Sequence, residues 1–256
     1  MLSKNTEKYI RSLHHAKYRK KYGSFIAEGP TICNELLKEK ADIERILALP
    51  TWYASPAGQQ APDGTEQVTL TPGELKKISA LTTPNQVLFV VRIPKPHLDA
   101  SVIKDHLVLA LENIRDPGNM GTIVRLADWF GIPAVICSNQ CVDLYNPKVI
   151  QSTMGSFARV HVFYRNLAEV LKEMKGKTRI FGSAMNGSNI YGRELQSSAI
   201  IVIGNESHGI SSELHPYIDE FLAIPQYKKG AESLNASVAA AIIVSEFRKN
   251  MLAGNN

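Results

Sequence analysis

A short segment in the second half of the chain combines side chains that can do acid–base and hydrogen-bond chemistry. Between two glycines it carries an amide, a carboxylate, a hydroxyl and an imidazole, in the order Gly204-Asn205-Glu206-Ser207-His208-Gly209. The flanking glycines allow a tight turn and a close approach of the backbone to a ligand. Ordinary turns would explain the same residues without any ligand. The segment is therefore a candidate binding loop.

Two other polar groups have a comparable composition. Ser233-Leu234-Asn235 precedes an alanine-rich run, where Ser233 or Asn235 can cap the free N–H groups of a helix. Residues 112–121 are dense in turn formers and contain Asn119. Short polar side chains on such loops can orient a substrate through hydrogen bonds.

A helix is expected to follow residues 112–121 and to stop at Gly131, because apolar residues recur at i, i+3, i+4 and i+7, at Ile123, Leu126, Ala127 and Phe130. At about 100° per residue, Arg125 lies nearly opposite this stripe, beside Thr122 and Trp129. A tryptophan that faces away from its own core indicates contact with another surface, such as a second subunit. The alternative for Arg125 is a solvated arginine paired with Asp128.

Buried strands precede the polar groups. Apolar runs at residues 107–111, 199–203 and 221–224 each end directly in loop-forming residues. Further strands are expected at residues 134–137, 159–163 and 179–183, with helices near 147–153 and 167–174. This alternation predicts an α/β fold with a mostly parallel sheet and helices on both faces. Because the carboxyl ends of parallel strands meet at one edge, the polar loops should lie together there.

Residues 1–95 are expected to form a smaller α/β domain. Strands are predicted at residues 24–28, 43–49, 67–70 and 87–91, and helices at 31–40 and 72–80, the second capped by Thr71. Residues 53–65 have the composition of a surface loop. Pro94 and Pro96 favour extended chain, so a linker should separate this domain from a larger one over residues 104–256.

The first 22 residues are strongly basic. Seven lysines and arginines stand against Glu7 alone, and three tyrosines and two histidines are interleaved with them. Cations mixed with aromatic rings suit a phosphate backbone with stacked bases, whereas a solvated basic face is the alternative. The candidate RNA contacts are Lys17, Arg19, Lys20 and Lys21, together with Arg115 in the larger domain.

Composition excludes several classes of protein. The chain is 44% hydrophobic and 21% charged, as in globular proteins. It has no apolar run long enough to cross a bilayer and no signal-peptide core, so we expect a soluble, cytoplasmic protein. The three scattered cysteines argue against a disulfide framework, and their spacing is not that of a metal site. Phosphate-binding and dinucleotide-binding glycine motifs are missing, as is the nucleophile elbow of hydrolases.

The three polar groups together resemble the motifs of the SpoU (TrmH-type) branch of the SPOUT RNA methyltransferases. The first motif spans residues 113–131 with Asn119 and Arg125, the second is Ile203-Gly204-Asn205-Glu206 with Gly209, and the third runs from Ile224-Pro225 to Ser233-Leu234-Asn235. The resemblance covers most of residues 107–247. The segments Tyr18-Arg19-Lys20-Lys21-Tyr22-Gly23 and Phe25-Ile26-Ala27-Glu28-Gly29-Pro30 also resemble the ribosomal-protein-like substrate-binding domain often attached to these enzymes.

The resemblance implies a ribose 2′-O-methyltransferase that uses S-adenosylmethionine. It also implies a carboxyl-terminal trefoil knot, an exception to the rule that chains are unknotted, and a homodimer with groups from both subunits near the reaction. The implied cofactor contacts are Ser183, Ala184, Ile203, Gly204, Asn205, Gly209, Ile224, Gln226 and Leu234.

The implied catalytic residues are Arg125, Asn119, Glu206, Ser233 and Asn235. In the family, the arginine that matches Arg125 acts on the hydroxyl as a base or as its positioner. A guanidinium is normally always protonated, so we favour positioning of the phosphate and the hydroxyl. The proton would then leave to phosphate or water, while the other four residues orient the arginine and the ribose.

The favoured substrate is ribosomal RNA, of the large subunit first, because the amino-terminal domain resembles that of rRNA-modifying members. Transfer RNA is the alternative substrate. A non-catalytic RNA-binding protein would have no reason to combine Asn119, Arg125, Glu206 and Asn235. A metabolic enzyme with an adenine cofactor would leave the basic, aromatic start unexplained.

Overall fold

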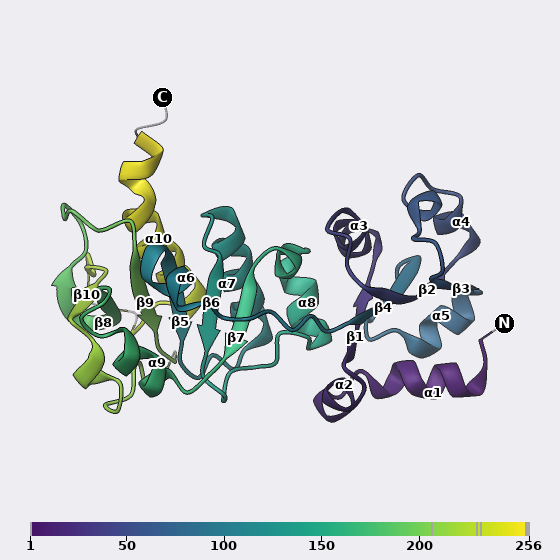
Figure 1. Cartoon of the computed structure of the whole chain (residues 1–256), viewed down its shortest axis with the longest axis horizontal. Helices are drawn as coiled ribbons and strands as arrows, with labels where there is room; N and C mark the ends of the chain where they lie inside the picture. The colour runs from purple at the N-terminus through teal and green to yellow at the C-terminus, as the bar shows by residue number, and fades with distance from the viewer. Residues whose placement is uncertain (1, 206, 229, 231, 254–256) are drawn as a thin grey trace. The chain divides into compact units, whose positions relative to one another are not determined.

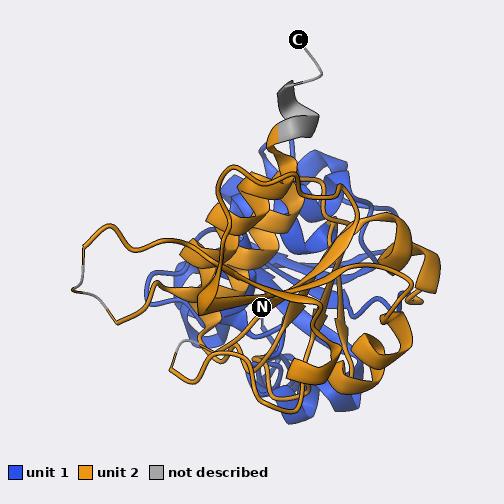
Figure 2. Cartoon of the chain, turned by 90° about the vertical axis from the view of Figure 1, so that its left-hand side faces the viewer, with its two compact units in different colours: residues 1–96, 143–158 blue, residues 97–142, 159–256 orange. Residues whose placement is uncertain are grey.

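The computed structural model describes residues 2–205, 207–228, 230 and 232–253. These residues form two compact units, coloured separately in Figure 2. Unit 1 comprises residues 1–96 and Asp143–Ala158, and unit 2 comprises His97–Val142 and Arg159–Asn256. In the described part of the chain, no helix has both the length and the apolar composition that a membrane span requires.

Unit 1 is built on a four-stranded mixed sheet in the order β1-β4-β2-β3 (Figure 1). The strands are β1 (Ser24–Glu28), β2 (Ile43–Ala48), β3 (Glu66–Thr69) and β4 (Val87–Arg92). Strand β4 pairs antiparallel with both β1 and β2, whereas β2 and β3 are parallel. The four strands lie where the apolar runs predicted them.

Helices and short helical turns surround this sheet. They are α1 (Lys4–Ser12), α2 (Ala16–Tyr22), α3 (Pro30–Lys38), α4 (Pro50–Tyr53), η1 (Gly58–Gln60), α5 (Pro72–Ile78), α8 (Pro147–Thr153) and η2 (Ser156–Ala158). Ile10 of α1 and Leu75 of α5 are buried in one core cluster with Leu47 and Val90 of the sheet. Thr71 caps α5 as predicted, within a reciprocal capping box with Glu74.

The structure differs from the expected domain division at Asp143–Ala158, a segment that we assigned to the larger domain and that belongs to unit 1. Aromatic packing explains the difference, because the buried Phe25 ring of β1 lies 4.6 Å from the Tyr145 ring and 5.7 Å from the Phe157 ring, measured between centroids. In addition, the Gln151 side-chain amide donates to the Glu28 carbonyl oxygen over 2.9 Å.

Unit 2 contains a six-stranded sheet in the order β10-β8-β9-β5-β6-β7 (Figure 1). The strands are β5 (Leu107–Leu111), β6 (Ala134–Cys137), β7 (His161–Tyr164), β8 (Ile180–Asn189), β9 (Ala199–Ile203) and β10 (Glu220–Ala223). Every neighbouring pair of these strands is parallel. Strands β5 and β9 are buried along their whole length, as expected for the centre of a sheet covered on both faces.

Helices cover both faces of this sheet. Side chains of α6 (Ala100–Asp105) and α9 (Leu167–Met174) share a core cluster with alternate residues of β5, β6 and β9, near the short turn η3 (His215–Tyr217). Helices α7 (Pro117–Trp129) and α10 (Ala236–Ala253) pack against each other. The Phe247 ring of α10 contacts the Phe181 ring of β8, at 5.2 Å between centroids. Neighbouring side chains of a strand point to opposite faces, and Ile180 belongs to the core cluster under α6 and α9. Phe181 and α10 therefore lie on the other face of the sheet.

The parallel arrangement brings the carboxyl ends of β5, β8, β9 and β10 to one edge of the sheet. The register between β8 and β10 shifts there, since Phe221 pairs with Gly182 but Leu222 pairs with Ser188. Residues 183–187 of β8 are therefore left outside the ladder, at the edge where the polar loops emerge.

Candidate active site

The loop after β5 is held by polar contacts below it. Asn113 adopts a left-handed conformation, with φ of +56°, and its N–H donates to the Ser138 hydroxyl oxygen over 3.0 Å. The next N–H, of Ile114, donates to the Cys141 sulfur over 3.3 Å. Hydrogen bonds from Cys137, Ser138 and the Ile114 N–H lower the pKa of the Cys141 thiol to about 7, against the effect of its burial.

The loop after β9 closes on itself as its glycines predict. Asn205 and Gly209 exchange backbone hydrogen bonds of 3.0 and 2.8 Å, and Gly209 has a φ of +67°. A β-carbon on Gly204 would lie 2.3 Å from the Gly209 carbonyl carbon, so no side chain fits at that position. Glu206, an expected catalytic residue within this loop, lies outside the described residues.

Two contacts join the loops after β5 and β9. The Asn205 side-chain amide donates to the Asn113 carbonyl oxygen over 3.0 Å. Glu112, only 8% exposed, accepts hydrogen bonds from both the N–H and the hydroxyl of Ser211, the former at 2.8 Å. The two loops therefore form one polar unit at the edge of the sheet.

The first turns of α7 and α10 meet through a pair of amides. Asp116 caps α7 by accepting from the Asn119 N–H over 2.8 Å. Asn235 rather than Ser233 caps α10, because its side-chain oxygen accepts from the N–H groups of Ser237 and Val238. The Asn235 side-chain N–H donates to the Asn119 side-chain oxygen over 2.9 Å. Two expected catalytic residues, 116 positions apart, are thus in direct contact.

Arg125 lies elsewhere on α7. It is exposed, six residues and therefore about 9 Å along the helix axis from the buried Asn119, and it points in a different direction. The alternative pairing with Asp128 is wrong, since Asp128 forms its ion pair with Arg159 at 2.8 Å. Trp129 on the same exposed surface is 85% exposed, as the helical pattern predicted.

The expected cofactor contacts lie at or just beyond the ends of β8, β9 and β10. Ile203 and Gly204 are buried, Ser183, Ala184, Asn205 and Ile224 are half-buried, and Gly209, Gln226 and Leu234 are exposed. Ser233 is exposed in the loop that leads to α10. This edge also carries exposed apolar side chains, since Leu234 is 46% exposed and the Tyr227 side chain is fully exposed.

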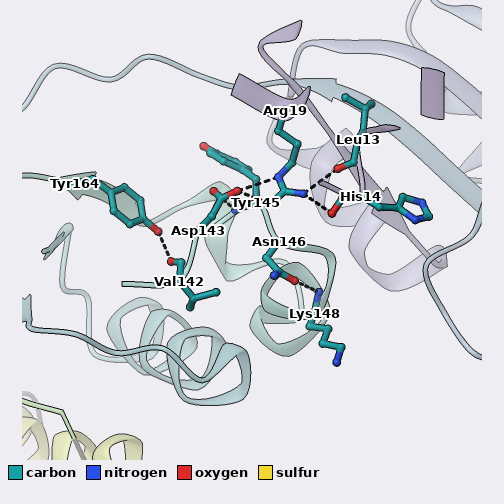
Figure 3. A network of polar contacts seen from close by, with 9 residues as sticks. All are labelled: Leu13, His14, Arg19, Val142, Asp143, Tyr145, Asn146, Lys148 and Tyr164. Carbon is teal, nitrogen blue, oxygen red and sulfur yellow. Dashed lines mark hydrogen bonds and ion pairs between the residues drawn. The ribbon is translucent and has the colours of Figure 1, made fainter. Parts of the chain in front are cut away.

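The expected RNA contacts divide into two groups. Lys17, Lys20, Lys21 and Arg115 are exposed. Arg19 is only 2% exposed, so its assignment to an RNA-binding surface requires correction. Its guanidinium donates to the Leu13 and His14 carbonyl oxygens and forms an ion pair with Asp143 at 2.6 Å, all within unit 1 (Figure 3). Arg19 is therefore a structural residue.

Sequence reasoning missed the residues that support these loops. Glu112, Ser138, Cys141 and Ser211 make the contacts described above but lie outside or at the margins of the three motifs. The one signal at the sequence level was Glu112, a carboxylate that directly follows a wholly apolar strand. A charged group in that position needs hydrogen-bond partners when the strand is buried.

Two family models match separate parts of the chain, and the one that matches residues 106–245 includes Asp143–Ala158, which packs with unit 1. Residues 106–245 match the SpoU rRNA Methylase family, and residues 4–88 match the MRM3-like substrate binding domain. The 23S rRNA (guanosine(2553)-2′-O)-methyltransferase RlmP of Bacillus subtilis is 31% identical over 240 residues, which cover 93% of this chain and 94% of the relative.

Solved structures share the fold over almost the whole chain. A putative RNA methyltransferase of the TrmH family from Porphyromonas gingivalis is 34% identical, with a TM-score of 0.86 and coverage of 98% of this chain and 99% of that one. The SpoU methyltransferase AviRb from Streptomyces viridochromogenes, in complex with AdoMet, has the same TM-score and coverage at 22% identity, which shows the fold alone.

Proposed function

This chain belongs to the SpoU rRNA methylase family, and we propose that it transfers a methyl group from S-adenosylmethionine to a ribose 2′-hydroxyl of ribosomal RNA. Large-subunit RNA is the favoured substrate, because the relative from Bacillus subtilis carries 23S rRNA in its name. The observation that carries the proposal is the hydrogen bond between Asn119 and Asn235, which joins two motifs that lie 116 positions apart in the sequence.

The residues at the carboxyl edge of the sheet suit S-adenosylmethionine. Gly204 lets the backbone of Gly209 fold close against it, and Gly209 itself is exposed without a side chain, so a ligand can approach the backbone there. Ala184, Ile224 and Leu234 offer apolar surface to an adenine ring, and Ser183, Asn205 and Gln226 offer polar groups. When bound, the cofactor supplies a methyl group activated by its attachment to a sulfonium.

Arg125 has the chemistry to hold the RNA in place. A guanidinium remains charged at neutral pH and presents several donors, which suits a phosphate and a neighbouring hydroxyl. The hydroxyl proton then leaves to phosphate or water. Asn119 and Asn235 are fixed by their mutual hydrogen bond, so they can orient the ribose, together with Ser233 and Glu206, without large loss of entropy.

A second copy of the chain would complete this site. Arg125 and Asn119 lie about 120° apart around α7, so we expect them to face different sites within one chain. The surface around Arg125 includes Trp129, and Val238 in the first turn of the adjacent α10 is 45% exposed. These side chains support a homodimer through α7 and α10, in which the Arg125 of one subunit serves the site of the other.

We also propose that the chain is knotted at its carboxyl-terminal end. Strand β9 comes directly before β10 in the sequence, but β10 pairs with β8 instead. The chain then returns, and α10 packs on α7. Such a return past earlier segments is consistent with the family's trefoil knot. A chain that could be drawn straight from both ends would contradict it.

Residues 1–95 serve as the RNA substrate-binding domain and residues 104–256 as the methyltransferase domain in this proposal. Lys17, Lys20, Lys21 and Arg115 supply exposed positive charge for phosphates. The three cysteines are free and buried, which fits action in the reducing cytoplasm.

The test is transfer of labelled methyl groups from S-adenosylmethionine to separated, unmodified RNAs. Large-subunit rRNA, small-subunit rRNA and tRNA are incubated with the full chain, and incorporation is measured in each. We expect label in large-subunit rRNA. Label in tRNA alone would change the substrate, and absence of label from every pool, with cofactor and RNA both bound, would contradict a catalytic role.

A further inference from the structure

Helices α1 and α2 of unit 1 border a groove with an unusual lining. Its volume is about 460 Å³, and it is lined by Tyr9, Tyr18 and Tyr22, by two histidines, and by Lys8 and Arg11. None of its described lining residues is acidic. A groove with this composition attracts an anion that also carries flat, polarisable rings.

The tyrosine rings form a connected set. The Tyr18 and Tyr22 rings are nearly parallel, at 15° between their planes and 6.2 Å between their centroids. The Tyr9 ring meets the Tyr22 ring edge-on at 5.2 Å. The Lys21 ammonium lies 5.4 Å from the Tyr22 centroid and adds a cation beside the same ring. The arrangement provides aromatic surface and positive charge together.

These tyrosines differ in how far the fold itself uses them. The Tyr9 hydroxyl donates to a Glu44 carboxylate oxygen over 3.2 Å, and the Tyr9 ring packs against the core of unit 1. Tyr22 is 42% exposed at the end of α2. Tyr9 therefore supports the groove, whereas Tyr22 is available to a ligand.

The angle between α1 and α2 is fixed by Arg19. Its guanidinium donates to the Leu13 and His14 carbonyl oxygens at the end of α1, at 2.9 Å each, and is held from the other side by Asp143 (Figure 3). Because these contacts lie within unit 1 and bury Arg19, the groove exists before any ligand arrives. Preformed sites bind without the entropic cost of ordering.

We propose that this groove binds an unpaired nucleotide of the RNA substrate, with its base stacked on Tyr22 and Tyr18 and its phosphates beside Lys8 and Arg11. In an A-form duplex the base faces are already stacked on one another, so a tyrosine can reach them only in loops, bulges or ends. The inference rests on the proposed function and specifies which form of RNA unit 1 recognises.

The test is equilibrium binding of labelled RNA to the full chain, with a single-stranded oligonucleotide and a duplex of the same length at one salt concentration. Tyr22→Ala should weaken single-strand binding by about 5- to 150-fold, as loss of one stacked base does. Duplex binding should stay unchanged. Tyr22→Phe keeps the ring and should bind single strands as the wild type does. Tyr22→Leu keeps apolar packing against Tyr9 and should bind like Tyr22→Ala.

Two lysine variants distinguish binding in the groove from nonspecific attraction of RNA to positive charge. Lys8→Ala should reduce the dependence of binding on salt by about one phosphate contact. Lys172→Ala removes an exposed lysine from α9 of unit 2 and should leave single-strand affinity unchanged. The assignment would be overturned if Tyr22→Ala kept its single-strand affinity, or if it lost duplex and single-strand affinity equally. A protein would then be the remaining candidate ligand of the groove.

The experiment distinguishes failure of this inference from failure of the proposed function. Oligonucleotide binding is measured without cofactor, whereas methyl transfer by the wild type is measured separately. Active wild type with unaltered Tyr22→Ala binding would overturn the groove assignment alone. Inactive wild type with the expected binding losses would contradict the methyltransferase proposal alone.

Discussion

At the scale of single residues, the proposed chemistry depends most on Arg125. Its exposure is ordinary for an arginine, but the neighbouring carboxylate that would neutralise it, Asp128, is already paired with Arg159. In the described chain no ion pair of Arg125 is found. Its charge is therefore free to meet a phosphate.

We predict that Arg125→Ala lowers kcat/KM for methyl transfer by at least about 100-fold, or about 2.7 kcal/mol. Cofactor affinity, measured by calorimetry, should survive because Arg125 is not among the expected cofactor contacts. Arg179→Ala is the matched control, since this half-exposed arginine precedes β8, at the opposite edge of the sheet. Near-normal turnover by Arg125→Ala would refute the assignment.

Cys141 gives a second prediction, which concerns pH. Its thiol pKa is lowered to about 7 from an ordinary value of 9.0, so the folded state favours the thiolate. The resulting stabilisation is fully present above about pH 9 and is lost as the pH falls through about 7.

The wild type should therefore have a higher free energy of unfolding than Cys141→Ser, and this difference should be about 1 kcal/mol larger at about pH 8 than at about pH 6. Denaturant titrations at both pH values measure this difference. Because Cys137 remains buried in both proteins, its own titration largely cancels. A gap that is the same at both pH values would show that Cys141 stays protonated.

At the scale of elements, Asn235 performs two tasks that substitution can separate. Its side-chain oxygen caps α10, and its side-chain N–H donates to Asn119. Aspartate keeps the oxygen for the cap but has no N–H for Asn119.

We predict that Asn235→Ala destabilises the chain by about 1 kcal/mol and impairs methyl transfer. Asn235→Asp should retain the stability of the wild type and still lose at least about tenfold in kcat, a change of about 1.4 kcal/mol in the barrier. Thermal unfolding and single-turnover kinetics measure the two effects. Full activity of Asn235→Asp would show that the contact between the amides is not needed.

Most strands and helices could be predicted from the sequence, above all the strands that are buried along their whole length. The strands at Ser24–Glu28, Leu107–Leu111 and Ala199–Ile203 agree with the prediction to the residue, because each has an apolar centre and is followed within two residues by a turn former. Helices α1 and α2 were not predicted. In α1 only Ile10 is buried and four of the nine residues are charged, so the basic composition hid the few apolar positions that face the core.

Part of the arrangement of the site could be expected from its motifs. They named Asn119 and Asn235, which the structure brings into direct contact, while the catalytic roles of these residues stay predictions. The sequence did not reveal that Arg19 is buried, because a basic run looks solvated until Asp143, 124 positions away, is seen beside it. The partners of Glu112 were also hidden, since Ser211 is 99 positions distant.

At the scale of the whole molecule, the account requires two copies of the chain. Trp129, 85% exposed, is the largest apolar side chain on the α7 surface that carries Arg125. Exposure of a tryptophan to water is unfavourable, by roughly 25 cal/mol for each Å² of apolar surface, unless a partner covers it.

We predict that the wild type sediments at twice the mass of the chain and that Trp129→Lys sediments as a monomer. The monomer should transfer no methyl group, because the Arg125 of one subunit would no longer reach the site of the other. Met154→Lys places the same charge on a 45% exposed apolar residue of unit 1 and should leave the dimer intact. A wild type that is monomeric and active would contradict the shared site.

The central claim is methyl transfer to a ribose, and the position of the label on the RNA tests it most directly. Large-subunit rRNA labelled by the wild type should be hydrolysed in alkali, because a 2′-O-methyl group protects the adjoining phosphodiester from cleavage. We expect the label in one alkali-resistant dinucleotide, and we expect none when Arg125→Ala replaces the wild type. Label recovered only in alkali-sensitive mononucleotides would place the methyl group on a base and contradict the account.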